Sequence, residues 1–180
     1  QRIGDSYLEF NNTGEDVETI IHGDYPNRSK YVNIMSSASG EGLSSKVFPR
    51  GYPFRERANI FPDYLTDKSD IKIGANAGLW LEEADIDAVT RIASRPLVES
   101  YELNGSKVLD FSNWTPLNSQ NTSFKAELIV GYFLSSEVGR YDDIYAGYIY
   151  QKLANHFGYT VSFGNPIVTQ HRNEHDLSLI

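Results

Sequence analysis

The 180-residue chain has the length of about one domain, and 40% hydrophobic and 22% charged residues exclude a disordered, collagen-like or coiled-coil protein. A net charge of −8 argues against nucleic-acid binding, which needs basic patches. The absence of cysteine excludes disulfides and thiolate metal sites. No apolar run approaches the roughly 18 residues of a membrane span. With no signal-peptide layout, we expect a cytoplasmic protein that reaches membranes only through partners.

The first half of the chain predicts short strands separated by loops. A strand-like run ends at Ile21, and residues 31–35 fit either a strand or a turn of helix. Residues 36–45 are rich in serine and glycine, which is typical of a loop. Three prolines exclude a regular helix from the aromatic segment 48–64. Residues 71–81 first alternate and then become continuously apolar, so they predict a buried strand.

Residues 85–93 have helical spacing, and a proline follows closely. Three apolar side chains share one face of this predicted helix, namely Ile86, Val89 and Ile92. Residues 107–111 follow an Asn-Gly turn and predict a strand.

The clearest helix begins at Asp142 and ends at Gly158. Its apolar residues recur at i, i+3 and i+4 spacing, namely Ile144, Tyr145, Tyr148, Ile149, Leu153 and Phe157. Residues 159–163 and 167–170 predict two further strands, joined by a Gly-Asn-Pro turn. Because strands and helices interleave, the sequence predicts an α/β or α+β protein.

Two neighbouring carboxylates, Asp142 and Asp143, open this helix soon after Arg140. A carboxylate that the helix dipole keeps ionised beside an arginine can act as a general base. The same residues are also ordinary helix caps. The spacing alone leaves both interpretations open.

Two metal-like patterns have simpler explanations. Asp85 and Asp87 form the Asp-x-Asp with which glycosyltransferases hold a divalent cation, but capping of the following helix explains the pair well. Residues 171–175 match the zinc-protease pattern His-x-x-Glu-His. Only five residues follow that match, too few for the further acidic ligand, so we treat it as fortuitous. His171 alone remains a candidate metal or phosphate ligand.

Arg50, Arg55 and Arg57 lie in the aromatic, proline-stiffened segment. Guanidinium groups suit phosphate and carboxylate recognition, although a solvated loop explains the cluster equally well. The chain contains neither of the glycine-rich phosphate-binding patterns, G-x-G-x-x-G or Walker A.

Several motifs occur together, in one order, over about residues 48–171. They are Arg50-Gly51-Tyr52-Pro53-Phe54 with Arg57; Gly78-Leu79-Trp80-Leu81 with Asp85, Asp87, Ala88 and Thr90; Asn121 with Phe124 and Leu128; Gly139-Arg140-Tyr141-Asp142-Asp143 with Ala146-Gly147; and His171. In this set the chain resembles the reversibly glycosylated polypeptides, a family of plant UDP-arabinopyranose mutases with microbial glycosyltransferase relatives.

The resemblance implies a GT-A-like fold that acts on nucleotide sugars, commonly UDP-linked, with a divalent metal (Mn²⁺ or Mg²⁺). It implies that Asp142 or Asp143 is the base that deprotonates an acceptor hydroxyl. By the same likeness, Arg50 is the position at which family members carry their reversible sugar, and Arg57 neutralises phosphate.

The remaining matched positions receive roles in the same way. Trp80 is expected to line the sugar pocket or to pack beneath it. His171 is expected near the metal or the diphosphate. Arg140 and Asn121 are expected to contact substrate or phosphate.

The family's nucleotide-binding strands and its aspartate-rich metal motif are not found before residue 48. We therefore expect residues 1–180 to form a single glycosyltransferase-like domain, the C-terminal, acceptor-side portion of a longer protein. The expected fold is α/β, a GT-A-like mixed sheet flanked by helices.

The function we predict is metal-assisted transfer of a sugar from a nucleotide sugar to a glycan or other acceptor, with an aspartate base. A UDP-sugar mutase is the alternative within the same chemistry, because ring contraction also begins with cleavage of the sugar–phosphate bond. A non-catalytic carbohydrate-binding or assembly module is the contrasting alternative.

Overall fold

The computed structural model describes residues 17–20, 30–43, 47–58, 72–103 and 106–172. The strands are β1 (Val17–Ile20), β2 (Ala38–Ser39), β3 (Lys72–Glu82), β4 (Ser100–Tyr101), β5 (Ser106–Leu109), β6 (Thr122–Phe124) and β7 (Tyr159–Gln170). The α-helices are α1 (Ala88–Ser94) and α2 (Asp142–His156), and the 3₁₀ helices are η1 (Phe54–Ala58), η2 (Ala126–Gly131) and η3 (Gly139–Tyr141).

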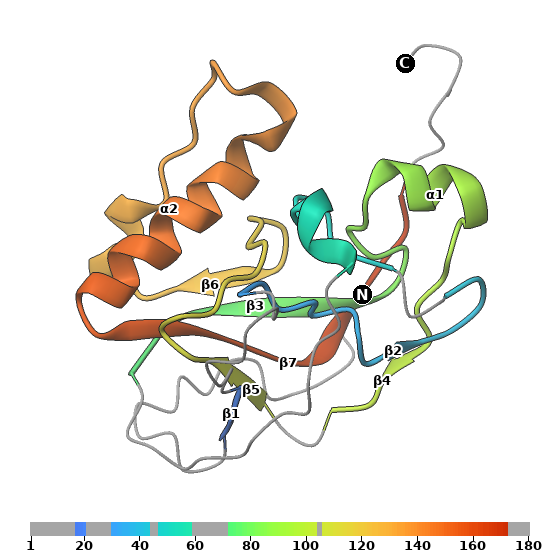
Figure 1. Ribbon diagram of the computed structural model, residues 1–180, viewed down its shortest axis with the longest axis horizontal. Coiled ribbons are helices and arrows are strands. Elements are labelled where there is room, and N and C mark those ends of the chain that lie inside the picture. Colours follow the sequence, from blue (N-terminus) through green and yellow to red (C-terminus); the bar gives the residue numbers. More distant parts are fainter. Residues whose placement is uncertain (1–16, 21–29, 44–46, 59–71, 104–105, 173–180) are drawn as a thin grey trace.

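Five strands form one mixed sheet in the order β1-β5-β7-β3-β6, and β2 pairs with β4 in a separate ribbon. β3 runs parallel to β7, whereas β5 and β6 pair antiparallel with β7 and β3. In the view of Figure 1, α2 and α1 lie above the sheet, over opposite ends of the two long strands. This mixed α/β arrangement confirms the predicted fold class and is consistent with part of a GT-A-like domain.

The strand predicted over residues 71–81 is confirmed as β3, most of whose residues are buried. The two strands predicted after Gly158 are instead one continuous strand, β7. Gly78 of β3 pairs with Gly164, but Trp80 pairs with Val168, so the β7 side carries two extra residues there. The Gly-Asn-Pro segment is therefore an irregularity within one strand, where a proline that lacks an N–H is tolerated.

The helix predicted over residues 85–93 exists as α1, but it begins only at Ala88, so Ile86 does not share a helical face with Val89 and Ile92. Val89 and Ile92 are 76% and 56% exposed. Ile86 is buried, yet it precedes the helix and packs with a second apolar cluster around Met35 and Val98. The start of this seven-residue helix is fixed by its N-cap, Asp87, whose carboxylate accepts the backbone N–H and the hydroxyl of Thr90.

The helix predicted from Asp142 is confirmed as α2, but the face that it buries differs from the prediction. Tyr145 and Ile149 are exposed, and the buried face carries small residues and polar groups: Asp143, Ile144, Ala146, Gly147, Tyr150, Gln151 and Ala154. A Cβ on Gly147 would lie 2.0 Å from the backbone oxygen of Leu117, so the helix approaches that segment closely. At Gly147 this face therefore has no room for a side chain.

Three shorter predictions have mixed outcomes. The strand predicted over residues 107–111 is β5, which ends two residues earlier. Residues 31–35 contribute only a bridge from Tyr31 to Trp114, and the loop predicted over residues 36–45 contains β2. Among the described residues no helix is both long and apolar enough to cross a membrane.

Candidate functional site

The Arg-Gly-Tyr-Pro segment is fixed against the start of α2. The backbone N–H of Arg50 donates to the Asp85 carbonyl at 2.9 Å. Gly51 has φ of 84° and lies so close to Ile144 that a Cβ there would be 2.4 Å from its Cγ2 atom. The Tyr148 hydroxyl donates to the Gly51 carbonyl at 3.2 Å. Only glycine combines this backbone conformation with this close approach.

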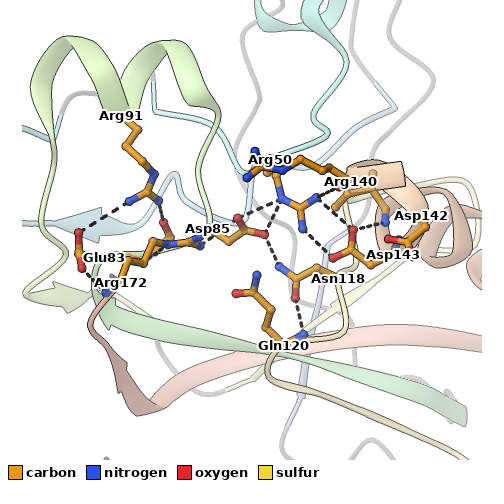
Figure 2. Close-up of polar contacts among 12 residues, drawn as sticks. Arg50, Glu83, Asp85, Arg91, Asn118, Gln120, Arg140, Asp142, Asp143 and Arg172 are labelled. Atoms are coloured by element: carbon orange, nitrogen blue, oxygen red, sulfur yellow. Dashed lines mark hydrogen bonds and ion pairs between the residues drawn. The ribbon is translucent and has the colours of Figure 1, made fainter. Parts of the chain in front are cut away.

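The Arg50 side chain then bridges two carboxylates. Its Nη1 and Nη2 atoms donate to Asp143 at 3.0 and 2.6 Å, a bidentate pair. Its Nε donates to both oxygens of Asp85, at 3.1 and 3.0 Å. Nη1 also donates to the Arg140 carbonyl at 2.9 Å. Figure 2 shows the guanidinium plane held between the two acidic side chains.

This pairing is electrostatically strong because water is largely excluded. Burial by itself lowers the pKa of Arg50, but the hydrogen bond to Asp143 and the charges of Asp85 and Asp143 outweigh it, so the pKa is raised overall. The side chains of Arg50 and Asp143 are 22% and 12% exposed. Bidentate arginine–carboxylate pairs fix geometry as well as charge.

Asp142 and Asp143 both lie in the first turn of α2, but only one of them anchors the arginine. Asp143 accepts from Arg50 with both oxygens, and its Oδ1 also accepts the N–H of Ile144 at 2.9 Å. Asp142 accepts the N–H of Asp143 through Oδ1 at 2.8 Å and is more exposed. Within the part of the chain that the structure describes, no side chain is hydrogen-bonded to Asp142.

Asp85 continues the network away from α2. It is 3% exposed and accepts from three side chains: Arg50, Asn118 at 2.8 Å and Arg172 at 3.1 Å. Arg172 also binds the backbone carbonyl of Glu83. In Figure 2 the groups form a row in which cations and carboxylates alternate, ending at Arg91. Burial, and next the charge of Arg172, lower the pKa of Arg91.

A small cleft opens beside this network. Arg50, Asp85 and Asn118 line it together with Trp80, Pro49 and Pro116. Trp80 also lines the cleft but is only 6% exposed, so most of its ring packs in the core. The cleft holds about 10 Å³, which is room for about one water molecule, so it marks where the polar groups meet and does not by itself accommodate a sugar.

The other predicted site residues lie in different environments. Arg57 pairs with Asp87 at 3.4 Å and lies over the rings of Phe48 and Phe54. Asn121 clamps β3, because its amide donates to the Leu79 carbonyl at 3.0 Å. These contacts account for both residues structurally, and their predicted roles in substrate or phosphate binding stay predictions.

His171 lies at the end of β7, where its Nδ1 is 2.7 Å from the Glu82 carboxylate and its side chain is 76% exposed. Among the described residues no group of three His, Cys, Asp or Glu side chains could hold a metal ion. The described residues therefore do not fit a complete Mn²⁺ or Mg²⁺ site, and no chemical step below relies on one. The prediction that His171 binds a metal or diphosphate stays a prediction.

Sequence reasoning missed Asp85, Asn118 and Arg172 as members of this site. It explained Asp85 as a helix cap, but Asp87 caps α1 and Asp85 lies in the charged network. Asp85 and Arg172 are 87 positions apart, so no local spacing could have linked them. The only usable signal was that Asp85 falls inside a recognised family motif.

The fold is a mixed α/β arrangement consistent with part of a GT-A-like domain, and the sequence motifs around Arg50, Asp85 and Asp143 meet in one charged network. The family model for "Reversibly glycosylated polypeptide" matches residues 20–179, and the chain belongs to this family. The match extends beyond both ends of the range 48–171 that the motifs covered.

Individual relatives carry mutase names. "Probable UDP-arabinopyranose mutase 1" of Pisum sativum is 27% identical over 149 residues, which are 79% of this chain and 37% of the pea protein. "UDP-arabinopyranose mutase 3" of Arabidopsis thaliana is 28% identical over 149 residues, which are also 79% of this chain and 37% of that protein. "Probable UDP-arabinopyranose mutase 4" of that plant is 25% identical over 172 residues, 90% of this chain and 43% of its own length. The chain thus spans about two fifths of these curated relatives, whose names match the mutase alternative better than the predicted transferase.

Proposed function

We propose that this chain is part of an enzyme that interconverts the pyranose and furanose forms of a UDP-linked pentose, the activity named in its relatives. The observation that carries the proposal is the guanidinium of Arg50, which Asp85 and Asp143 fix beside the start of a helix that begins with two carboxylates. Because the chain spans about two fifths of those relatives, we propose that it supplies the acceptor-side portion and that other residues of the protein bind the nucleotide.

Ring interconversion begins with cleavage of the bond between sugar C1 and the diphosphate. Negative charge then accumulates on the leaving diphosphate, and fixed cations stabilise it. Arg50 lines the cleft. Arg140 is a second cation close by, because its backbone carbonyl accepts from Arg50 while its residue is exposed. Trp80 packs beneath the cleft. A divalent metal held elsewhere in the protein would add further charge stabilisation.

A second sugar hydroxyl then attacks C1 and loses its proton, the bond from C1 to the old ring oxygen breaks as that oxygen takes up a proton, and the diphosphate re-forms its bond to C1. An aspartate can accept the first proton and return it to the old ring oxygen. Asp143 is poorly suited, because Arg50 engages both of its oxygens. Asp142 lies in the same first turn of α2, is more exposed, and has no side-chain hydrogen-bond partner among the described residues. We therefore assign the proton transfer to Asp142 and the anchoring of Arg50 to Asp143.

The experiment is a product analysis of the intact protein that carries this sequence. UDP-arabinopyranose is supplied with Mn²⁺ or with a chelator, with and without a glycan acceptor, and the nucleotide sugars are separated by chromatography. Appearance of UDP-arabinofuranose without acceptor supports the mutase. Release of UDP that requires the acceptor, with no change of ring form, would instead identify a transferase. Glycan binding without either reaction would identify the non-catalytic module.

A further inference from the structure

Arg50 would be free to swing if Asp143 were its sole anchor. A guanidinium held end-on by one carboxylate can still tilt about that contact, whereas a second acceptor at its Nε edge fixes its plane. Asp85 is that second acceptor, with both oxygens within 3.1 Å of Nε. Unlike Asp143, it comes from the loop between β3 and α1, so its hold on Arg50 is independent of α2.

Asp85 is itself held from three directions. Asn118 donates to its Oδ2 and Arg172 donates to its Oδ1, from the segment before β6 and from the end of β7. The carboxylate is 3% exposed, which is costly for an anion without close cations. Arg50 and Arg172 together balance the charges of Asp85 and Asp143. Removal of Arg172 would leave two buried carboxylates sharing one cation.

We propose that Asp85 is a positioning residue that fixes the guanidinium of Arg50 at the cleft, and that Arg172 supports it by neutralising its second charge. The effect of this positioning on catalysis rests on the proposed function, but the positioning of Arg50 by Asp85 does not. Neither residue needs to touch the substrate. The loop after β3 and the end of β7 thereby act on the site at α2 through Arg50.

The test reads Arg50 directly, by NMR of its Nε–H group in the intact protein. In the wild type we expect a well-dispersed signal whose hydrogen exchange is slow, because the N–H is bound to Asp85. Asp85→Asn is expected to accelerate that exchange by about tenfold or more, the equivalent of about 1.4 kcal/mol of lost protection. Asp110→Asn is the matched control, because it makes the same change in a hydrogen-bonded carboxylate at the end of β5. An exchange rate of the Arg50 Nε–H group that rises equally in both variants, or in neither, would overturn the proposal.

Asp85→Asn leaves two arginines beside one carboxylate and lowers stability for that reason alone. The double variant Asp85→Asn/Arg172→Met restores the charge balance. We expect its melting temperature to recover toward the wild-type value while the Arg50 exchange stays fast. Recovery of both together would show that Asp85 acts only on stability, which contradicts positioning.

Kinetics of the mutase reaction then separate the two proposals. We expect the double variant to lose about tenfold in kcat with little change in KM, because a misplaced cation weakens the transition state more than the bound substrate. If the wild type shows no ring interconversion, the proposed function fails while the Arg50 measurement still stands. If the wild type is active and the double variant keeps the wild-type kcat with a mobile Arg50, the catalytic consequence of positioning is wrong.

Discussion

Asp142 and Asp143 are neighbours in the sequence, yet their carboxylates have different surroundings. Asp143 is buried and engages Arg50 through two short hydrogen bonds. Asp142 contacts only the backbone of the first helical turn among the described residues and is more accessible. One position therefore serves structure, and the other is available for chemistry.

This difference predicts opposite effects of two equivalent substitutions on stability. Asp143→Asn leaves Arg50 without its bidentate partner, and removal of one member of a buried pair costs about 3 kcal/mol in the free energy of unfolding. Asp142→Asn loses one dipole-favoured carboxylate at the start of a helix, which costs about 0.5 kcal/mol. Urea unfolding of both variants checks the ranking. Equal losses would mean that the Arg50–Asp143 pair contributes no more than an ordinary helix-terminal charge.

At the scale of elements, the close approach of α2 to the Leu117 segment depends on Gly147. Alanine is normally better than glycine inside a helix, by about 1 kcal/mol. At this position the added Cβ would meet a backbone oxygen at 2.0 Å, and backbone cannot move aside as a side chain does. The geometry outweighs the helix propensity.

Gly147→Ala is therefore expected to destabilise the protein by about 2–3 kcal/mol through overpacking. The comparison is Gly158→Ala, where nothing lies within 4 Å of the added Cβ and only the positive φ opposes the change. That variant is expected to cost about 1 kcal/mol. Thermal unfolding followed by circular dichroism measures both. A stabilised Gly147→Ala protein would show that α2 is not packed against Leu117 as described.

The elements that the sequence predicted well are the long ones with a clear pattern, β3 and α2. Their finer features were missed for identifiable reasons. The buried face of α2 depends on Gly147 and on Gln151, which exchanges hydrogen bonds with the Thr115 backbone, and neither residue contributes to an apolar pattern. The Gly-Asn-Pro segment in β7 resembles a turn, because a turn and a strand irregularity favour the same residues. In the candidate site the motifs located Arg50 and Asp143, but Arg172 was found only through the fold.

At the scale of the whole molecule, one buried and three half-buried tyrosines set the response to alkali. Burial is the largest cause that raises the pKa of Tyr101, Tyr132, Tyr148 and Tyr150 above the ordinary value of 10.0. In the unfolded chain these phenols ionise near that ordinary value. Their contribution to stability is therefore complete below about pH 10 and is lost as the pH rises above it.

We thus expect these four phenols to ionise in an alkaline titration only together with loss of the folded state. Ultraviolet absorbance of tyrosinate, followed alongside far-ultraviolet circular dichroism, checks this. Complete ionisation of all tyrosines while the protein remains folded would contradict the burial described for these four.

The central claim is that the carboxylate of Asp142, next to the anchored Arg50, carries the proton transfer of a UDP-pentose mutase. The most direct measurement is the rate of ring interconversion by the intact protein with Asp142→Asn against the wild type. We predict a loss of about 100-fold or more in kcat, with KM and melting temperature close to wild type. A variant that keeps wild-type kcat would contradict the assignment of Asp142 as the base.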